Sequence, residues 1–199
     1  MSSVVLSGDT SGAITLSAPA VAGTNTITLP AGTGTVAVQG ASTNIVSGTA
    51  VASTSGTSID FTSIPSWVKR ITVMFQGVSI NGNSGMRIQI GTASGIESTG
   101  YSGQEQYTGT GTGTSAVTTG FSGSTGGGNT VVRNGSCVIT LLNSSSYIWV
   151  ATGMSFQNDG YNRMFGASKA LGGTLDRVRI NANNGTDAFT AGSINILYE

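Results

Sequence analysis

Few residues of this 199-residue chain have side chains that could do acid–base or nucleophilic chemistry. The chain contains no His, so neither a histidine-based triad nor histidine metal ligation is possible. Its one Cys, Cys137, alternates with Ile139 and Leu141, which predicts a buried small hydrophobic side chain. The acidic residues are scattered, and no two have the spacing of a catalytic carboxylate pair. We therefore predict no catalytic residues, no cofactor and no enzyme activity.

Two segments contain groups that bind ions in other proteins. Asn158, Asp159 and Asn162 supply side-chain oxygens that suit Ca²⁺. The alternating acids of an EF-hand-like loop are absent there, so a turn is the favoured interpretation. The Gly-rich segment Ser122–Gly128 lacks the Lys-Ser/Thr ending and the following helix of a phosphate-binding loop. We predict no metal site in either segment.

Aromatic side chains could stack against sugar rings if they are exposed. Tyr147 and Trp149 fall on the strand face opposite Ile148 and Val150, which we expect to point inward. Two interpretations stay open for Tyr147 and Trp149: a second core face in a sandwich, or an exposed platform for sugars or a neighbouring subunit. The candidate receptor- or glycan-contacting residues are Tyr101, Tyr107, Tyr147, Trp149 and Tyr161.

Composition excludes several classes of partner. Lys and Arg together number 8, as do Asp and Glu, so there is no basic stripe for nucleic acid or an anionic membrane. No apolar run approaches the roughly 20 residues that span a bilayer. Residues 1–20 lack the basic start and apolar core of a signal peptide. Short β-branched runs separated by Gly, Ser, Thr and Asn predict an all-β fold with many turns.

Residues 1–44 differ from the rest of the chain. No charged residue lies between Asp9 and Asp60, and minimal strand patterns of the Ile-Thr-Leu type recur between glycines. The segment has too few large apolar residues for a core of its own, so we expect its apolar side chains to be buried against other molecules. The alternative is a flexible linker. The candidate assembly residues of this arm are Ile14, Leu16, Ile27, Leu29, Val36 and Val38.

Residues 45–199 contain strand patterns at regular spacing. Arg70–Ile80 is the longest, and Gly77 within it predicts a bulge or a close backbone approach. Residues 92–128 are expected to form long loops and weak strands. Counting from Ile59, about eight strands predict an antiparallel β-sandwich of jelly-roll type. The other predicted strands lie around Met86–Ile90, Ser136–Leu142, Tyr147–Ala151 and Tyr161–Leu171.

The last quarter of the chain gives the clearest alternation. Val178 and Ile180 fall on one strand face, and Arg177 and Arg179 on the other, where we expect them to be solvated or paired between subunits. Ile194, Ile196 and Tyr198 share one face of the final strand. The Asn184-Gly185 pair between these strands supplies the positive φ angles of a tight turn.

Three stretches resemble a known family. They are GDTSGAITLSAPAVAGTNTITLPAGTGTVAV (8–38), IDFTSIPSWVKRITVMFQGVSINGNSGMRIQIG (59–91) and GTLDRVRINANNGTDAFTAGSINILYE (173–199). They resemble small virion structural proteins of tailed bacteriophages, of the tail-fibre or minor tail type. The resemblance implies a virion component made in the host cytoplasm, forming a homotrimer, with an arm that docks on the particle and a β domain that points outward. It brings no catalytic residues.

The sequence therefore predicts a phage structural protein, a tail fibre or tail appendage, with a virion-anchoring arm (1–44) and a trimeric β-sandwich (45–199) that contributes to host contact. Loops within 92–128 and 153–162 are the expected distal tip. One alternative is a capsid decoration or head-fibre protein that clamps capsid subunits, and another is a lectin-like glycan-binding module. We expect other virion proteins as partners, no nucleic acid and no membrane insertion.

Overall fold

The structure is a computed structural model that describes residues 3–7, 13–17, 45–122, 126 and 129–199. The chain divides into two units, Met1–Ala37 and Val38–Glu199. In the first unit, β1 (Ser3–Ser7) pairs antiparallel with β2 (Ala13–Ser17), which contains the candidate arm residues Ile14 and Leu16. The other candidate arm residues lie outside the described residues, and they are Ile27, Leu29, Val36 and Val38.

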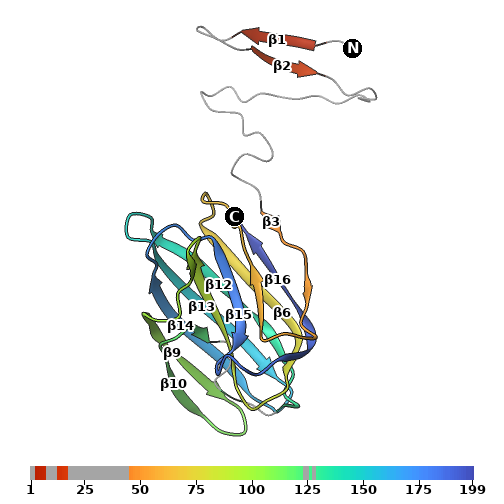
Figure 1. Cartoon of the computed structure of the whole chain (residues 1–199), viewed down its shortest axis with the longest axis vertical. Helices are drawn as coiled ribbons and strands as arrows, with labels where there is room; N and C mark the ends of the chain where they lie inside the picture. The colour runs from red at the N-terminus through yellow and green to blue at the C-terminus, as the bar shows by residue number, and fades with distance from the viewer. Residues whose placement is uncertain (1–2, 8–12, 18–44, 123–125, 127–128) are drawn as a thin grey trace. The chain divides into compact units, whose positions relative to one another are not determined.

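Two antiparallel sheets form the second unit (Figure 1). The large sheet has the strand order β10-β9-β14-β13-β12-β6-β16-β3, and β4 pairs with β16 beside β3. Its strands are β3 (Val46–Ser47), β4 (Val51–Ala52), β6 (Arg70–Ile80), β9 (Tyr101–Thr108), β10 (Gly113–Val117), β12 (Arg133–Asn143), β13 (Ile148–Gln157), β14 (Asn162–Ala170) and β16 (Phe189–Tyr198).

The small sheet has the order β11-β7-β15-β5, and β8 pairs with β7. The buried apolar side chains of both sheets form one core, so the predicted all-β antiparallel sandwich is confirmed. The chain crosses between the sheets along β5, β6, β7 and β9, whereas β12, β13 and β14 form a meander within one sheet. The strands of the small sheet are β5 (Ser58–Phe61), β7 (Met86–Thr92), β8 (Gly95–Ile96), β11 (Phe121–Ser122) and β15 (Arg177–Ala182).

The strong alternations of the sequence reappear in the structure. Val178 and Ile180 are buried on β15, and Ile194 and Ile196 are buried on β16. Gly185 has a φ of 75°, as the predicted Asn-Gly turn requires. These strands form the framework on which the less regular middle of the chain is arranged.

The middle of the chain contains more strand than predicted. Residues 92–128 were expected to form loops and weak strands, but β9 is an eight-residue strand paired on both sides, with β10 and β14. From β5 onward the described residues form twelve strands, not about eight. The prediction failed because β9, YSGQEQYT, has no aliphatic alternation, so its inward positions do not look like core positions.

The residues of β13 that point inward are also the opposite of those predicted. Trp149 and Ala151 are buried, whereas Ile148 and Val150, which were expected inward, are only half-buried on the opposite face. Both faces of this strand carry apolar residues, so the period-2 pattern alone does not decide between them. The larger side chain, Trp149, fills the core.

The two ends of the sandwich differ in what they contain. We call the end at which Val46 pairs with Tyr198 the proximal end, because the chain from residue 45 joins the sandwich there. Residues 61–67 lie at this end, and Ile64 in this segment is buried. The opposite, distal end contains the turns between β6 and β7, β9 and β10, β13 and β14, and β15 and β16.

The predicted close approach at Gly77 is confirmed. Its φ is 69°, and it lies against Gly192, whose φ is 96°, at a register shift between β6 and β16. The Gly77 N–H donates to Asn134 Oδ1 at 2.8 Å, which ties the bulge to β12. A Cβ added to Gly192 would lie 2.5 Å from the carbonyl carbon of Gly77, so only glycine fits there.

We expect Gly192→Ala to lower the free energy of unfolding by about 3 kcal/mol, because the new Cβ meets backbone and the residue must adopt a positive φ. Urea denaturation of the purified protein measures this. Gly173→Ala is the matched control, because its Cβ meets only a methyl group at 3.7 Å; it should change stability by less than about 0.5 kcal/mol. Equal losses in the two variants would contradict the assignment of a backbone contact at Gly192.

Candidate functional site

The residues considered for chemistry have structural roles. Burial raises the pKa of the Cys137 thiol above its ordinary value, so this side chain stays protonated and apolar in character. Asn158 Oδ1 accepts the Val132 N–H at 2.8 Å, and Asp159 Oδ1 accepts the Tyr161 N–H at 3.4 Å, which are turn contacts. Across the described ranges, no cluster of three or more His, Cys, Asp or Glu side chains is arranged to hold a metal ion.

The five candidate aromatic residues do not form one surface. Tyr101 and Trp149 belong to the core, with 4% and 2% of their areas exposed, so their predicted role as sugar contacts is wrong. Both lie on the inward face of the large sheet, in one row across β9, β14 and β13. The Tyr101 hydroxyl is also occupied, because it accepts the Ile90 N–H at 2.8 Å and donates to the Ile90 carbonyl at 3.3 Å.

The other three aromatic residues lie at opposite ends of the sandwich. Tyr107 and Tyr161 are half-buried at the distal end, with their rings 5.8 Å apart edge to face. The Arg163 guanidinium lies 5.0 Å from the Tyr107 ring centre and 5.7 Å from that of Tyr161, so it holds both rings. Tyr147 is half-buried at the proximal end, in the turn before β13.

The expected tip segments are divided in the same way. Residues 109–112 and 158–161 form turns at the distal end. Residues 93–100 lie at the proximal end, between β7 and β9. The distal end therefore includes only part of the segment 92–128 that was expected there.

The charged residues of the large sheet point mostly inward. Arg163 Nη1 donates to Glu105 Oε1 at 3.0 Å, and Glu105 is fully buried. Lys169 is 6% exposed and pairs with Glu97. Arg133 is 0% exposed. Burying a charged group costs free energy. Strands that nevertheless place their charges inward must have a reason to exclude charge from their outward face.

Arg133 binds backbone carbonyls. Its guanidinium donates to the carbonyl oxygens of Val131 at 3.1 Å, Ser84 at 3.4 Å and Gly126 at 3.4 Å. Burial, and after it the positive charge of Arg163, lowers the pKa of Arg133 to about 10. None of the five ion pairs among the described residues includes it. Arg133 thus fastens three segments at the distal end.

The outward face of the large sheet, which we call the outer face, is almost free of charge. Among its described strands only Arg70, at the proximal end, places a charge there, and Arg70 is paired with Glu199. One row of the face runs in register across six strands. Its members are Met74, Ser136, Met154, Met164, Gln106 and Thr114. At about 4.8 Å between strands, this uncharged row is roughly 24 Å long.

Large apolar side chains are exposed on the outer face. Met154 is 61% exposed, Phe156 54% and Met164 47%. Met154 lies directly opposite Met164, and Phe156 is two residues from Met154 on the same face, so the three are contiguous. A contiguous exposed apolar group within an uncharged surface is typical of a contact with another protein. These residues are not among the site residues predicted from the sequence, although Met154 and Phe156 alternate with Ser155 and Gln157 and so mark one face of the strand.

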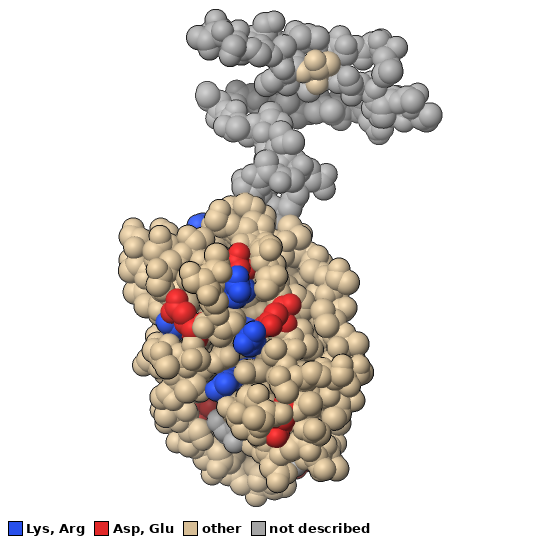
Figure 2. All heavy atoms as spheres, in the orientation of Figure 1, with Lys and Arg blue, Asp and Glu red and all other residues tan. Residues whose placement is uncertain are grey.

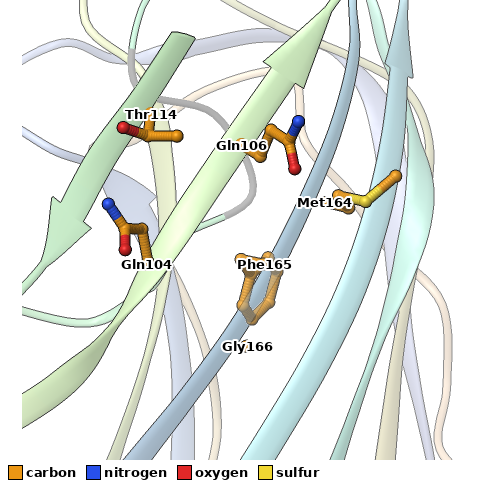
Figure 3. A pocket seen from close by; sticks show the side chains of 6 residues that line it. All are labelled: Gln104, Gln106, Thr114, Met164, Phe165 and Gly166. Carbon is orange, nitrogen blue, oxygen red and sulfur yellow. The ribbon is translucent and has the colours of Figure 1, made fainter.

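A hollow of about 360 Å³ lies beside the exposed residues. Gly166 contributes no side chain to it, and a Cβ there would meet nothing within 4 Å. Figure 3 shows Gln104, Gln106 and Thr114 on one side of the hollow and Met164 on the other. The outer face therefore has both a protruding apolar group and an adjacent depression.

The small sheet has the opposite character. Arg179 makes two bonds to Asp60, of 2.7 and 2.9 Å, and Arg177 pairs with Asp176 at 2.9 Å. Figure 2 shows acidic and basic side chains side by side in the middle of the face that carries β15. Both arginines are thus partly exposed and paired within the chain, so the expected alternative of pairing between subunits is replaced by pairing with Asp176 and Asp60. This charged face suits contact with water.

Comparison with protein-family models, curated proteins and solved structures finds no match to this chain. In the described part of the chain, no helix is long and apolar enough to cross a membrane. The candidate functional site is therefore defined by its own geometry, and it is the outer face of the large sheet.

We expect Arg133→Ala to lower the free energy of unfolding by about 3–5 kcal/mol, because it opens a cavity and removes a hydrogen-bond donor from three carbonyl oxygens. Guanidinium denaturation measures the loss. Arg177→Ala, which removes a partly exposed ion pair, is the control and should cost at most about 1 kcal/mol. If Arg133→Ala were no more destabilising than Arg177→Ala, the fastening role of Arg133 would be wrong.

Proposed function

We propose that this protein is a structural component of a bacteriophage virion, a tail fibre or tail appendage. In this proposal residues 1–44 attach to the particle, and residues 45–199 assemble as a homotrimer that contributes to host contact. The observation that carries the assembly role is the uncharged outer face with Met154, Phe156 and Met164 exposed on it. The three stretches that resemble phage tail proteins supply the virion context.

Other copies of this chain are the partners that best suit the outer face. A partner of opposite charge is not required, because the face is uncharged apart from the paired Arg70. Two such faces can approach without desolvating or opposing charges. The exposed methionines adapt their shape to a partner surface, and phenylalanine adds buried apolar area.

The layout of the outer face allows the copies to associate as a closed ring. Met154 and Phe156 protrude from β13, while Met164 on β14 lines the hollow together with residues of β9 and β10. If Met154 and Phe156 of one copy insert into the hollow of the next, the contact is heterologous, and a three-fold rotation between copies closes it into a ring. In a ring of three copies, the outer face of each copy is covered by a neighbouring copy.

The distal end is the proposed host-facing end. The chain from the arm joins the sandwich at the proximal end, so an arm fixed on a particle would leave the distal turns free. Of the five candidate aromatic residues, only Tyr107 and Tyr161 lie at that end. A lectin-like role would use this pair.

A capsid decoration or head-fibre role shares the same assembly chemistry. Copy number separates the two, because a tail appendage is present in a few tens of copies or fewer and a decoration protein in hundreds. Cryo-EM of the intact particle counts the copies and places them. A location on the capsid lattice in hundreds of copies would replace the tail assignment but keep the outer face as an interface.

We expect the full-length protein to be a trimer and Met154→Glu to dissociate it, because each interface would then bury an unpaired carboxylate. Analytical ultracentrifugation at micromolar concentration measures the mass. The substitution leaves the fold intact, since Met154 is exposed in the single chain, and circular dichroism verifies this.

The matched control is Thr57→Glu, which adds the same charge at an exposed turn outside the outer face. It should remain trimeric. A wild-type protein that sediments as a monomer would contradict the proposed assembly. A trimer that is equally stable in Met154→Glu would show that the outer face is not the interface.

A further inference from the structure

Three Asn-Gly pairs occur in the chain, and they are Asn81-Gly82, Asn134-Gly135 and Asn184-Gly185. An Asn-Gly pair can modify itself, because the backbone nitrogen of the glycine attacks the side-chain carbonyl carbon of the asparagine and no Cβ shields that nitrogen. The reaction is faster where a base can take the proton of the attacking N–H and where a donor stabilises the oxygen that becomes negative. The three pairs differ in whether they have these two groups.

Asn81-Gly82 has both groups. The pair lies in the turn between β6 and β7, and Asn81 is exposed. The Ala188 N–H donates to Asn81 Oδ1 at 2.9 Å, so a donor already points at the oxygen on which negative charge develops. A Cβ added to Gly82 would collide with the Asp187 carboxylate, which therefore lies directly against the glycine as a proton acceptor.

The Asp187 carboxylate is held beside the turn without being paired with a cation. The Ser84 N–H donates to Asp187 Oδ2 at 3.1 Å, which fixes the orientation of the side chain. None of the five ion pairs among the described residues includes Asp187. Since a carboxylate has about four lone-pair sites, one contact leaves Asp187 able to accept a further proton.

Asn134-Gly135 lies inside the large sheet. Its strand, β12, is paired on both sides, with β6 and β13. Asn134 Oδ1 accepts the Gly77 N–H at 2.8 Å, and a Cβ added to Gly135 would meet the backbone of β13 and the Phe75 ring. The ladders hold the backbone extended, so the glycine nitrogen cannot turn toward the asparagine side chain.

Asn184-Gly185 is the close comparison, because it also lies in an exposed turn at the distal end. Asn184 Oδ1 accepts the N–H groups of Thr186 and Asp187, at 3.1 and 3.0 Å, so it has donors to its oxygen. However, the Gly185 N–H donates to the Ala182 carbonyl at 2.9 Å, and a Cβ added to Gly185 would meet nothing within 4 Å. This pair therefore lacks the carboxylate that Gly82 has.

From these differences we propose that Asn81 is a self-modification site, at which Asp187 acts as the base. A bond forms between Gly82 N and Asn81 Cγ, and the bond between Cγ and Nδ2 breaks. The proton of the Gly82 N–H passes by way of the Asp187 carboxylate to Nδ2, which leaves as ammonia. Water then opens the resulting succinimide ring and leaves an aspartyl or isoaspartyl residue at position 81.

The modification acts on a contact between two distal turns. Asn81 Oδ1 and the Ala188 N–H join the turn between β6 and β7 to the turn between β15 and β16. An isoaspartyl residue adds a methylene group to the main chain, and either product places a second carboxylate near Asp187, so both weaken this contact. The site is complete within one chain and does not depend on the proposed virion role.

Incubation of the purified full-length protein in mildly alkaline buffer, followed by peptide mass spectrometry, measures deamidation at each of the three asparagines. In the native protein we expect Asn81 to react about tenfold faster than Asn184, and Asn134 to react slowest. The same protein unfolded in urea is the reference, because the three pairs then lose their tertiary contacts and should react at similar rates.

Asp187→Asn should slow the reaction at Asn81 about tenfold or more, because an amide is not a base, and it should leave Asn184 unchanged. The new amide oxygen can still accept the Ser84 N–H, so the turn keeps this contact. Asn134 reports on the fold, because a loosened sheet would speed its reaction. In that case the ratio of the Asn81 and Asn184 rates in the unsubstituted protein decides.

Asp176→Asn is the matched control. It removes a carboxylate that pairs with Arg177 at the other end of β15, and it should leave the rate at Asn81 unchanged. The proposal is overturned if Asn81 reacts no faster than Asn184 in the native protein, or if Asp187→Asn does not slow Asn81 in a protein whose Asn134 stays slow.

Discussion

The reversed polarity of the large sheet is the constraint on which the rest of the structure depends. Its strands bury Glu105, Arg133, Arg163 and Lys169 on the inward face. Glu105 and Arg163 pair with each other, Lys169 pairs with Glu97, and Arg133 donates to backbone carbonyls. The opposite face keeps almost no charge and exposes large apolar side chains. In a protein that remained a single chain in water, this arrangement would cost free energy on both faces of the sheet.

The remaining features follow from that division. The buried Arg163 also holds Tyr107 and Tyr161, so the distal end gains order from a charge inside the sheet. The small sheet carries paired charges outward and forms the solvated side of the sandwich. The Gly77–Gly192 contact lets β6 and β16 pair closely in spite of their bulges. One side of the molecule is thereby suited to water and the other to contact with protein.

The sequence predicted the strands whose alternation is aliphatic and missed those whose inward positions are polar. Val178 and Ile180 on β15 were assigned correctly because a single face of that strand is apolar. β9 was missed because one of its two buried positions is Glu105, which in isolation indicates an exposed site. The inward face of β13 was assigned wrongly because both faces carry apolar residues, Ile148 and Val150 on one and Trp149 on the other. A buried ion pair between strands distant in sequence cannot be read from either strand alone.

The central claim, that the outer face is covered by other copies of this chain, is tested most directly by methionine oxidation. Peroxide treatment of the full-length protein, followed by peptide mass spectrometry, compares Met154 and Met164 with Met86, which is fully buried in the core. We predict that Met154 and Met164 are oxidised about as slowly as Met86 in the native assembly, and rapidly once it is unfolded. Rapid oxidation of both residues in the native protein would contradict the account.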